Sequence, residues 1–410
     1  MPAPFARRAA AATSRLLFAA GVRVLFLAHS FPRFAVDPVG SFVLRLAVAL
    51  RATGMDVSVV APGGPGLAGR ETFEDVTVDR FRYAPRRLET LGYTGTMRSQ
   101  VLGSWAARFA MASFLVADFL KALRVGRRIR PQIVHAHWAL PGGLVATWLG
   151  RLWRVPVIVT LHGSDVRLAQ GVPLAARLFR HALTRATAVT TVSSWLARET
   201  AALAPGVEPV VAPMPIVADL FRPGPSRQRD RLLFVGKLNP QKGIVHLLHA
   251  LARMRARPTL DIVVGVGSLE DETRALARGL GIAERLRWHP LLPQADLARL
   301  YREATVLVMP AVDEGLGLVA AEAQLSETPV VAFESGGLTD VVVHQETGLL
   351  VPPGDVTALA AALDGVLARP DQGASLGRAG RQHALARFAP DAAARRYADL
   401  YHNALGAAAA

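Results

Sequence analysis

The sequence predicts an α/β protein with two doubly wound parallel sheets, and three observations lead to that prediction. First, short apolar strands alternate with helical stretches along the chain, which is the order that βαβ units produce. Second, the chain has 410 residues of which 51% are hydrophobic, enough for two or three domains with large cores. Third, the alternation is interrupted near residues 213–225, where prolines cluster and indicate a linker.

The N-terminal half supplies the first set of elements. Strands are predicted at the short apolar runs 22–27, 57–60, 133–137, 157–160 and 188–192. A helix is predicted over residues 39–53, where Gly54 ends it, and a long helical stretch over roughly 98–130, which Pro131 closes. Residues 1–20 are basic but lack a clean apolar core and a cleavage signal, so we expect a flexible tail there.

The C-terminal half repeats the alternation. Its predicted strands are 231–236, 261–265, 285–288, 305–309, 329–333 and 348–351, and a last helix covers 391–405. The expected organisation is therefore a tail, two domains and a terminal segment. Their predicted boundaries are 1–20, 21–214, 215–388 and 389–410.

The turn after the strand at 306–309 is the most informative part of the chain. Gly315 and Gly317 lie between that strand and a helix, where glycine lets backbone N–H groups approach a ligand. The N-terminus of a helix favours a diphosphate. Glu314 and Glu322 flank the turn, and carboxylates accept hydrogen bonds from sugar hydroxyls. A diphosphate with a sugar on either side is a nucleotide-sugar.

The scarcity of lysine points to the same ligand. Of the 47 basic residues only Lys121, Lys237 and Lys242 are lysines. Lys237 and Lys242 lie on one loop between a strand and a helix, and two compact ammonium charges there suit a diphosphate leaving group. The alternative is that both are surface lysines placed by chance.

These residues give the chain a resemblance to GT-B glycosyltransferases, close to the large family 4 of retaining enzymes. The family pattern of a Gly-(Arg/Lys)-x4-Lys-Gly loop stands here as residues 236–243, and its Glu-x7-Glu segment as residues 314–322. The resemblance continues through 328–332, 335–337 and 346–355, and covers roughly residues 21–400.

The resemblance implies a fold and an activity. The fold would be two Rossmann-like domains that face each other across a cleft, with the last helix crossing back to the N-terminal domain. The N-terminal domain would bind the acceptor and the C-terminal domain the nucleotide-sugar donor. The activity would be transfer of a sugar, with retention, to a hydroxyl of a glycan or lipid-linked acceptor. It implies no cofactor and no metal.

The resemblance also assigns roles to single residues. Lys237, Lys242, Glu314 and His162 would be catalytic, the lysines by neutralising the departing diphosphate. The donor would be bound by Gly40, Gly236, Gly267, Leu292, Gly315, Leu316, Gly317, Leu318, Val319 and Glu322. Structural interpretations of these residues stay open: Glu314 as a helix cap, Glu322 as a solvated helix residue, and Gly267 as part of a plain turn.

The acceptor side would involve Arg33, His137 and Asp165. Asp165 orients its neighbours or caps the following helix, and Arg33 meets an anionic acceptor or is solvated. His137 and His135 point the same way on a strand, yet no third metal ligand is apparent. Val39 precedes Gly40 where the family commonly has a second glycine, so the geometry of that loop is open.

Charge and composition limit the partners. Residues 1–205 hold 26 basic and 10 acidic residues, whereas residues 206–410 hold 21 and 22. This excess favours an anionic membrane surface, a phosphorylated lipid carrier or an acidic glycan, although arginine-rich composition explains it equally well. No basic–aromatic motif indicates nucleic acid. The chain has no cysteine, which excludes disulfides and thiolate metal sites but does not indicate a redox compartment. No apolar run is long enough to span a bilayer. We expect a cytoplasmic protein, peripheral at the cytoplasmic face of the membrane if associated.

Two other functions remain open from the sequence. A nucleotide-sugar epimerase on the same fold would consume donor without an acceptor. A non-catalytic sugar-nucleotide-binding scaffold is disfavoured, since scaffolding requires none of Lys237, Lys242, Glu314 and Glu322. Retention would arise by front-face attack or through a covalent intermediate; no carboxylate nucleophile can be placed, so we favour the first.

Overall fold

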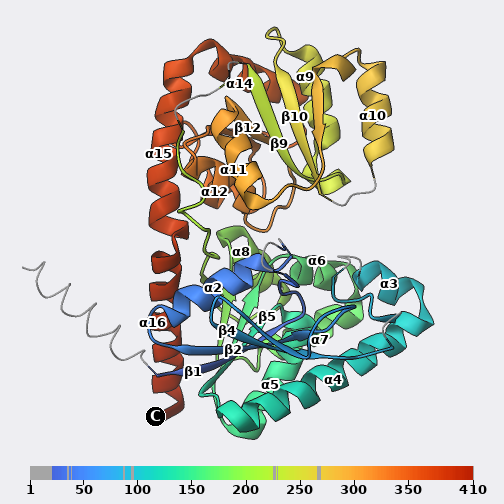
Figure 1. Cartoon of the computed structure of the whole chain (residues 1–410), viewed down its shortest axis with the longest axis vertical. Helices are drawn as coiled ribbons and strands as arrows, with labels where there is room; N and C mark the ends of the chain where they lie inside the picture. The colour runs from blue at the N-terminus through green and yellow to red at the C-terminus, as the bar shows by residue number, and fades with distance from the viewer. Residues whose placement is uncertain are drawn as a thin grey trace, which may run out of the picture. The chain divides into compact units, whose positions relative to one another are not determined.

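The computed structural model describes residues 21–34, 37, 39–85, 88–93, 97–224, 228, 230–265 and 269–409. The chain divides into two compact units, one of Met1–Pro215 with Pro390–Ala410 (the N unit) and one of Ile216–Ala389 (the C unit). The predicted boundaries at 214/215 and 388/389 each lie one residue before these divisions. The predicted tail over residues 1–20 lies outside the described residues, and Figure 1 follows the rest from blue to red.

The N unit contains an eight-stranded sheet in the order β3-β4-β2-β1-β5-β6-β7-β8, parallel except for β3, which runs antiparallel to β4. Its strands are β1 (Arg23–Ala28), β2 (Asp56–Pro62), β3 (Arg70–Phe73), β4 (Val76–Phe81), β5 (Ile133–His137), β6 (Val157–Leu161), β7 (Ala188–Thr191) and β8 (Val210–Val211). The predicted doubly wound sheet is thus confirmed, with three additional strands.

The additional strands β3 and β4 have a polar sequence for a physical reason. Arg80 and Asp79 on β4 are buried, where a strand from an apolar core would carry hydrophobic side chains. Arg80 forms an ion pair with Glu71 of β3, and Asp79 one with Arg128 at 2.6 Å. Because buried charges are tolerated only when paired, the strand is stabilised by partners distant in the sequence.

The helices of the N unit are α2 (Ser41–Arg51), α3 (Met97–Gly103), α4 (Trp105–Ile129), α5 (Leu144–Trp153), α6 (Ser164–Gly171), α7 (Pro173–Leu183), α8 (Ser194–Leu203) and α16 (Pro390–Ala409). The helical stretch predicted over roughly 98–130 is present, divided into the two helices α3 and α4. The helix is broken at Ser104, whose φ of −143° and ψ of 130° are extended. Gly103 precedes it, and a glycine followed by an N-cap residue ends one helix and begins another.

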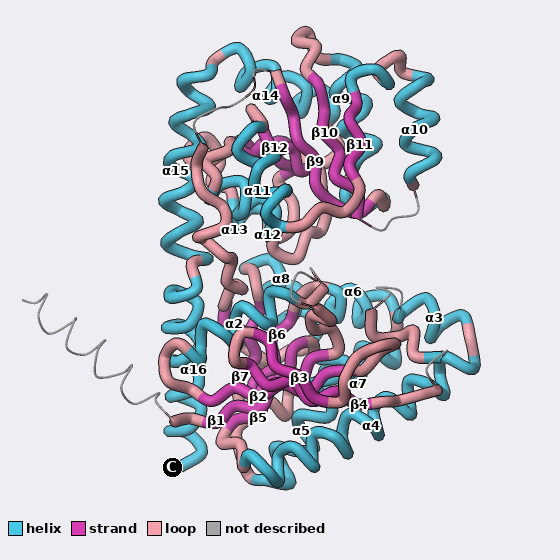
Figure 2. Tube along the Cα trace, viewed as in Figure 1, coloured by secondary structure: helices cyan, strands magenta, loops and turns pink. Residues whose placement is uncertain are grey.

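The C-terminal helix α16 is part of the N unit, where it packs against α2. Tyr401 bonds to Nδ1 of His135 on β5 at 2.6 Å, and Tyr397 donates to the carbonyl of Ala212 at 3.1 Å. Buried aromatic rings with satisfied hydroxyls therefore hold the end of the chain on the sheet. Figure 2 shows α16 beside the strands of this unit.

The C unit has a six-stranded parallel sheet in the order β11-β10-β9-β12-β13-β14. Its strands are β9 (Arg231–Lys237), β10 (Thr259–Gly265), β11 (Leu286–His289), β12 (Val306–Met309), β13 (Val330–Phe333) and β14 (Leu349–Val351). Its helices are α9 (Ile244–Arg253), α10 (Glu270–Gly279), α11 (Gln294–Glu303), α12 (Leu318–Leu325), α13 (Leu338–Val341), α14 (Val356–Ala368) and α15 (Pro370–Phe388). All six predicted strands of this half are present.

Candidate functional site

The candidate site of the C unit lies where its strand order reverses. The chain proceeds from β9 through β10 to β11 on one side, then returns to β12 on the other side of β9. β9 and β12 are hydrogen-bonded neighbours, with Leu233 opposite Leu307. The loops at the carboxyl ends of these strands therefore meet, and such a switch point is where doubly wound sheets bind ligands. The predicted Lys237–Lys242 and Glu314 loops are these two loops.

An ion pair joins the two loops. Nζ of Lys242 lies 2.5 Å from Oε2 of Glu314, and the side chains are only 22% and 16% exposed. The side chain of Asn239 accepts from the backbone N–H of Lys242 at 3.0 Å, which fixes the short turn Pro240–Lys242. Two residues predicted separately as phosphate-binding and sugar-binding are thus direct partners.

Main-chain hydrogen bonds hold the same loops together. The backbone N–H of Val312 donates to the carbonyl of Gln241 at 2.9 Å, and the side-chain amide of Gln241 donates to the carbonyl of Asp313 at 3.0 Å. The position of Lys242 relative to Glu314 is therefore set by the backbone as well as by their charges.

A third loop, Ser335–Gly337 after β13, is hydrogen-bonded to the Glu314 turn. The backbone N–H of Gly337 donates to the carbonyl of Glu314 at 2.7 Å, and Oγ of Ser335 accepts from the N–H of Asp313 at 3.0 Å. Gly336 has a φ of 60°, and a Cβ there would lie 2.4 Å from the carbonyl oxygen of Glu314. Only glycine permits so close an approach of the two backbones.

Helix α12 begins immediately after this turn, with Gly317 at its N-cap. In the described part of the chain no side chain caps this end, and its first turn holds no acid, so its N–H groups suit an anion. Gly315 and Leu316 are buried, while Leu318 and Val319 are partly exposed. The predicted donor-binding residues 315–319 thus form a continuous turn and helix start.

Glu322 lies one turn further along α12. Its Oε2 accepts a hydrogen bond from the hydroxyl of Tyr301 at 2.9 Å. Burial raises the pKa of Glu322 to about 7, and the Tyr301 hydrogen bond offsets part of that rise. Glu322 is therefore not the solvated helix residue of the alternative interpretation. Tyr301 was not predicted from the sequence, since nothing local connects it to Glu322.

The other predicted residues of this half have fewer contacts with the Lys242–Glu314 pair. Gly236 is the next-to-last residue of β9 and lies beside the side chain of Lys242: a Cβ added at Gly236 would be 3.7 Å from Cδ of that lysine. Lys237 is exposed at the end of β9, and no ion pair joins it to a described carboxylate. Leu292 is partly exposed after the edge strand β11, and Gly267 lies outside the described residues.

In the N unit, Gly40 forms the start of α2 directly after the loop that follows β1. Its φ is 71°, and a Cβ there would lie 2.4 Å from the carbonyl oxygen of Ser30. The loop before it is held by Asp37, which accepts from the backbone N–H groups of Arg33 and Val39 at 3.0 and 3.1 Å. The open question about Val39 is answered in part: one glycine suffices for this turn.

Arg33 is paired within the same loop. Its Nε lies 2.6 Å from Asp37, and its guanidinium lies 5.1 Å from the ring centre of Tyr93. The Asp37 partner raises the pKa of Arg33, and its charge is already balanced. This pairing favours a structural role for Arg33 over the predicted contact with an anionic acceptor.

His137 and His162 form the second candidate cluster, at the carboxyl ends of β5 and β6. Nδ1 of His137 lies 3.2 Å from Nε2 of His162, and their rings are stacked. Trp138 contacts both His162 and His29, with ring centres 4.5 and 4.1 Å apart. Burial lowers the pKa of His29 to about 4 and holds those of His137 and His162 well below the usual range. The cluster is therefore neutral at pH 7.

Two ring nitrogens of this cluster are unpaired within the part of the chain that the structure describes. Nδ1 of His29 and Nε2 of His137 are buried and lack a hydrogen bond among the described residues. Buried polar atoms are normally satisfied, so unpaired ones indicate a place for a ligand or water. His29 was missed in the sequence analysis, although its position directly after β1 places it at the same sheet edge.

Asp165 has a structural arrangement. Its carboxylate accepts from the backbone N–H groups of Ala139, Gly163 and Val166, each at 3.1 Å. It thereby ties the start of α6 to the turn after Trp138, whose φ of 72° is strained for a non-glycine residue. The two predicted roles of Asp165, orienting its neighbours and holding the start of the following helix, therefore apply together. With its carboxylate used in these bonds, direct contact of Asp165 with an acceptor is disfavoured.

The described residues contain no group of three or more His, Cys, Asp or Glu side chains placed to share a metal ion. His135 uses both ring nitrogens in hydrogen bonds, to Tyr401 at 2.6 Å and to Thr160 at 2.7 Å. It is thus a satisfied core histidine.

The comparison with known proteins follows the division of the chain. Residues 39–215 match the family described as glycosyl transferase 4-like domain, and residues 218–383 match glycosyl transferases group 1. The chain is 35% identical to a D-inositol 3-phosphate glycosyltransferase of Frankia alni, over 90% of this chain and 95% of that protein. It is 29% identical to a glycogen synthase of Mycobacterium tuberculosis, over 90% and 91%.

A solved structure shares the fold. A sucrose-phosphate synthase of Thermosynechococcus elongatus superimposes with a TM-score of 0.79 at 24% identity, covering 94% of this chain and all of that one. Together with the two parallel sheets, each with its own cluster of polar side chains at the carboxyl edge, these matches show that the chain belongs to the group 1 glycosyltransferases of the GT-B fold.

Proposed function

We propose that this glycosyltransferase moves a sugar from a nucleoside-diphosphate sugar to a hydroxyl of a glycan or lipid-linked acceptor, with retention and without a metal ion. The observation that carries the proposal is the Lys242–Glu314 pair at the switch point, next to the uncapped N-terminus of α12. Cations and backbone N–H groups for a diphosphate, and carboxylates for hydroxyls, lie within one set of loops.

Each group of the C unit has a distinct role in this proposal. The ammonium groups of Lys237 and Lys242 and the N–H groups of residues 317–319 bind the diphosphate, where negative charge grows as the sugar departs. Glu314 accepts from sugar hydroxyls and keeps Lys242 in position. Glu322 accepts from a hydroxyl of the nucleotide ribose.

The histidines of the N unit serve hydroxyl groups. Neutral imidazoles donate and accept without attracting a diphosphate, and the unpaired nitrogens of His29 and His137 have capacity for such bonds. We assign His162 to a sugar hydroxyl at the reaction centre. A relative named glycogen synthase and another named for D-inositol 3-phosphate both indicate hydroxyl-rich acceptors.

The chemical step breaks the bond between the anomeric carbon and the diphosphate oxygen and forms one to the acceptor oxygen. The acceptor proton passes to the departing phosphate, so no protein base is required. Attack from the same face gives retention. A covalent glycosyl–enzyme would need a carboxylate at the anomeric carbon, and we assign Glu314 to hydroxyl binding instead.

Calorimetry with UDP-, GDP- and ADP-sugars tests the donor site, on the wild type, Glu314→Ala, and Glu284→Gln as a matched control at an exposed glutamate. We expect one donor to bind the wild type and the control alike, and the Glu314 variant to lose discrimination between sugars. No binding by folded wild type would contradict the proposal.

Product analysis tests the reaction. Incubation of the donor without acceptor separates transfer from epimerisation, because an epimerase converts the donor to a new nucleotide-sugar. The same assay in EDTA tests metal independence, for which an unchanged rate is expected. We also propose that the protein works in the cytoplasm, at the membrane face when its acceptor is lipid-linked.

A further inference from the structure

Helix α4 is apolar on the side that faces solvent. Trp105, Phe109, Val116 and Leu120 are 74%, 75%, 58% and 51% exposed. Their spacing of four, seven and four residues aligns them in one stripe along the helix. The opposite side is buried through Phe114 and its neighbours, so the stripe is additional to the core-facing side.

Neighbouring helices extend this apolar surface. On α5, Trp148 and Leu152 are exposed, and the Trp148 ring lies 6.3 Å from that of Phe119 on α4. Leu102 on α3 and Leu174 on α7 are exposed as well. Contacts join α3 to α4, α4 to α5, and α5 to α7, and Figure 2 shows α4 and α5 along one side of the sheet. We call the outer side of α3, α4, α5 and α7 the outer helical face.

The charges of this face have one sign. Its four helices contain nine lysine or arginine residues, of which Lys121 and Arg128 pair with the buried Asp79 of β4, and a single acid, Asp118. Asp118 is buried, and burial raises its pKa to about 8, so it is largely uncharged at pH 7. Arg124 and Arg127 are exposed, and no ion pair joins either to a described carboxylate. Arg108 lies 4.5 Å over the ring of Trp105.

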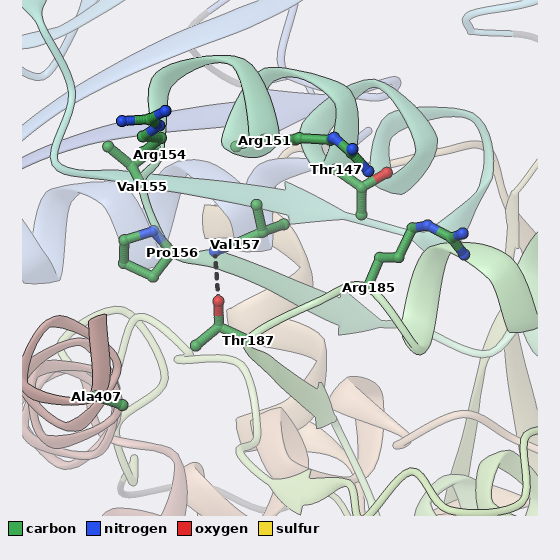
Figure 3. Close-up of a pocket in the computed structure, with 10 residues that line it drawn as sticks. Thr147, Arg151, Arg154, Val155, Pro156, Val157, Arg185, Thr187 and Ala407 are labelled. Atoms are coloured by element: carbon green, nitrogen blue, oxygen red, sulfur yellow. Dashed lines mark hydrogen bonds between the residues drawn. The ribbon is translucent and has the colours of Figure 1, made fainter. Parts of the chain in front are cut away.

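A basic cavity adjoins α5. It has a volume of about 450 Å³, and its lining includes Arg151, Arg154, Arg185 and two threonines, with no acid among the described residues that form it. Figure 3 shows Arg151 on the helix above Val157, and Arg185 on the loop that leads to Thr187. Arg151 is three residues from Trp148, so the cavity borders the apolar stripe of α5.

We propose that the outer helical face docks the protein on an anionic phospholipid bilayer. The apolar side chains enter the boundary between headgroups and acyl chains, where tryptophan is favoured. The arginines contact lipid phosphates, and the cavity at Arg151, Arg154 and Arg185 receives one headgroup phosphate. A surface with only positive charges and with exposed aromatic rings is more complementary to an anionic bilayer than to a partner protein whose surface has charges of both signs. This inference does not depend on the proposed reaction.

Co-sedimentation of the full chain with phosphatidylcholine vesicles, with and without phosphatidylglycerol, tests the inference. We expect binding to the anionic vesicles to exceed that to neutral ones at least tenfold. Trp105→Ser/Phe109→Ser should abolish binding to both kinds of vesicle. Arg124→Gln/Arg127→Gln should reduce the anionic preference by about fivefold for each arginine removed.

Matched controls lie on the C unit. Arg278→Gln/Arg287→Gln removes the same charge from exposed arginines, and Leu291→Ser removes an exposed apolar side chain; both should bind like the wild type. Thermal melts verify folding of each variant. Equal binding by wild type and the Trp105/Phe109 variant overturns the inference. A second outcome also overturns it: light scattering without vesicles shows that the wild type is an oligomer and that the Trp105/Phe109 variant is a monomer. In that case a second copy of the chain covers the face.

Discussion

The two candidate clusters occupy equivalent edges of two similar sheets but differ in charge. In the C unit, Lys242 and Glu314 are a charged pair 2.5 Å apart. In the N unit, His137 and His162 are a stacked pair whose low pKa keeps both rings neutral. Both pairs lie at the carboxyl ends of adjacent parallel strands. The same architecture therefore provides one charged cluster and one neutral cluster.

The difference has a physical basis in how each pair is surrounded. Lys242 and Glu314 keep part of their side chains in solvent, which reduces the cost of their charges. His137 is fully buried among aromatic rings, and this burial, together with the neighbouring histidines, lowers its pKa. In our proposal, the first environment binds the departing diphosphate and the second binds a neutral sugar.

The largest effect is expected from Lys242→Gln. This change removes a cation where the diphosphate charge develops, and loss of one such group typically costs ~10²–10³-fold in kcat. We expect a loss of that size in steady-state assays with the donor found by calorimetry. Lys121→Gln is the matched control, since Lys121 is also paired with a carboxylate, Asp79, at 3.3 Å.

The charged pair is tested further with Glu314→Gln and the double variant. If the two residues act as a unit, the double variant loses about as much activity as either single one. Fully multiplicative losses would show that the 2.5 Å contact has no part in catalysis. An unchanged rate in Lys242→Gln would remove the C unit cluster from the mechanism altogether.

A smaller effect is expected from His162→Asn. The change keeps a donor and an acceptor but alters their placement, so we expect roughly a tenfold lower kcat, the size of one hydrogen bond. The matched comparison is His135→Asn, which removes the bonds to Tyr401 and Thr160.

The two histidine variants should differ in kind. His135→Asn should lower the melting temperature and leave the rate per folded molecule near that of the wild type. His162→Asn should lower the rate per folded molecule and leave the melting temperature near that of the wild type. If His162→Asn lowers stability and leaves kcat unchanged, His162 is structural like His135. The neutral cluster of the N unit then has no role in the reaction.

The fold was predictable wherever one local rule decided each element. Apolar runs such as Val306–Met309 become parallel strands because they are buried on both faces. Strand β4 was missed because Asp79 and Arg80 interrupt its apolar pattern, and the partners that stabilise them are not adjacent in sequence. The helical stretch over roughly 98–130 was predicted, but its division at Ser104, whose backbone is extended, was not placed.

The candidate sites were predictable as residue sets but not as contacts. The sequence identified Lys242 and Glu314 separately, yet their ion pair depends on β9 and β12 being neighbours. Arg33 was open to a functional role because Asp37, four residues away, was not considered as its partner. Spatial pairing across a sheet follows from strand order, which periodicity does not provide.

The smallest effect is a pH dependence that belongs to the C unit. The pKa of Glu322 is raised to about 7, whereas that of His29 is lowered to about 4 and those of His137 and His162 lie well below their usual range. Between pH 6 and 8 only the first of these groups changes charge. We expect the donor KM to rise a few-fold from pH 8 to pH 6, as Glu322 is protonated and loses its charge-assisted bond to ribose.

Glu322→Gln separates this effect from other titrations. Its donor KM should be nearly constant from pH 6 to 8 and close to the low-pH value of the wild type. Because the folded-state pKa exceeds the ordinary value of 4.5, Glu322 contributes stability that is complete below about pH 4.5 and lost as the pH rises through 7. The variant should therefore melt higher than the wild type at pH 8. A KM that still rises below pH 7 in this variant would place the titrating group elsewhere, and a histidine of the N unit would be the first to re-examine.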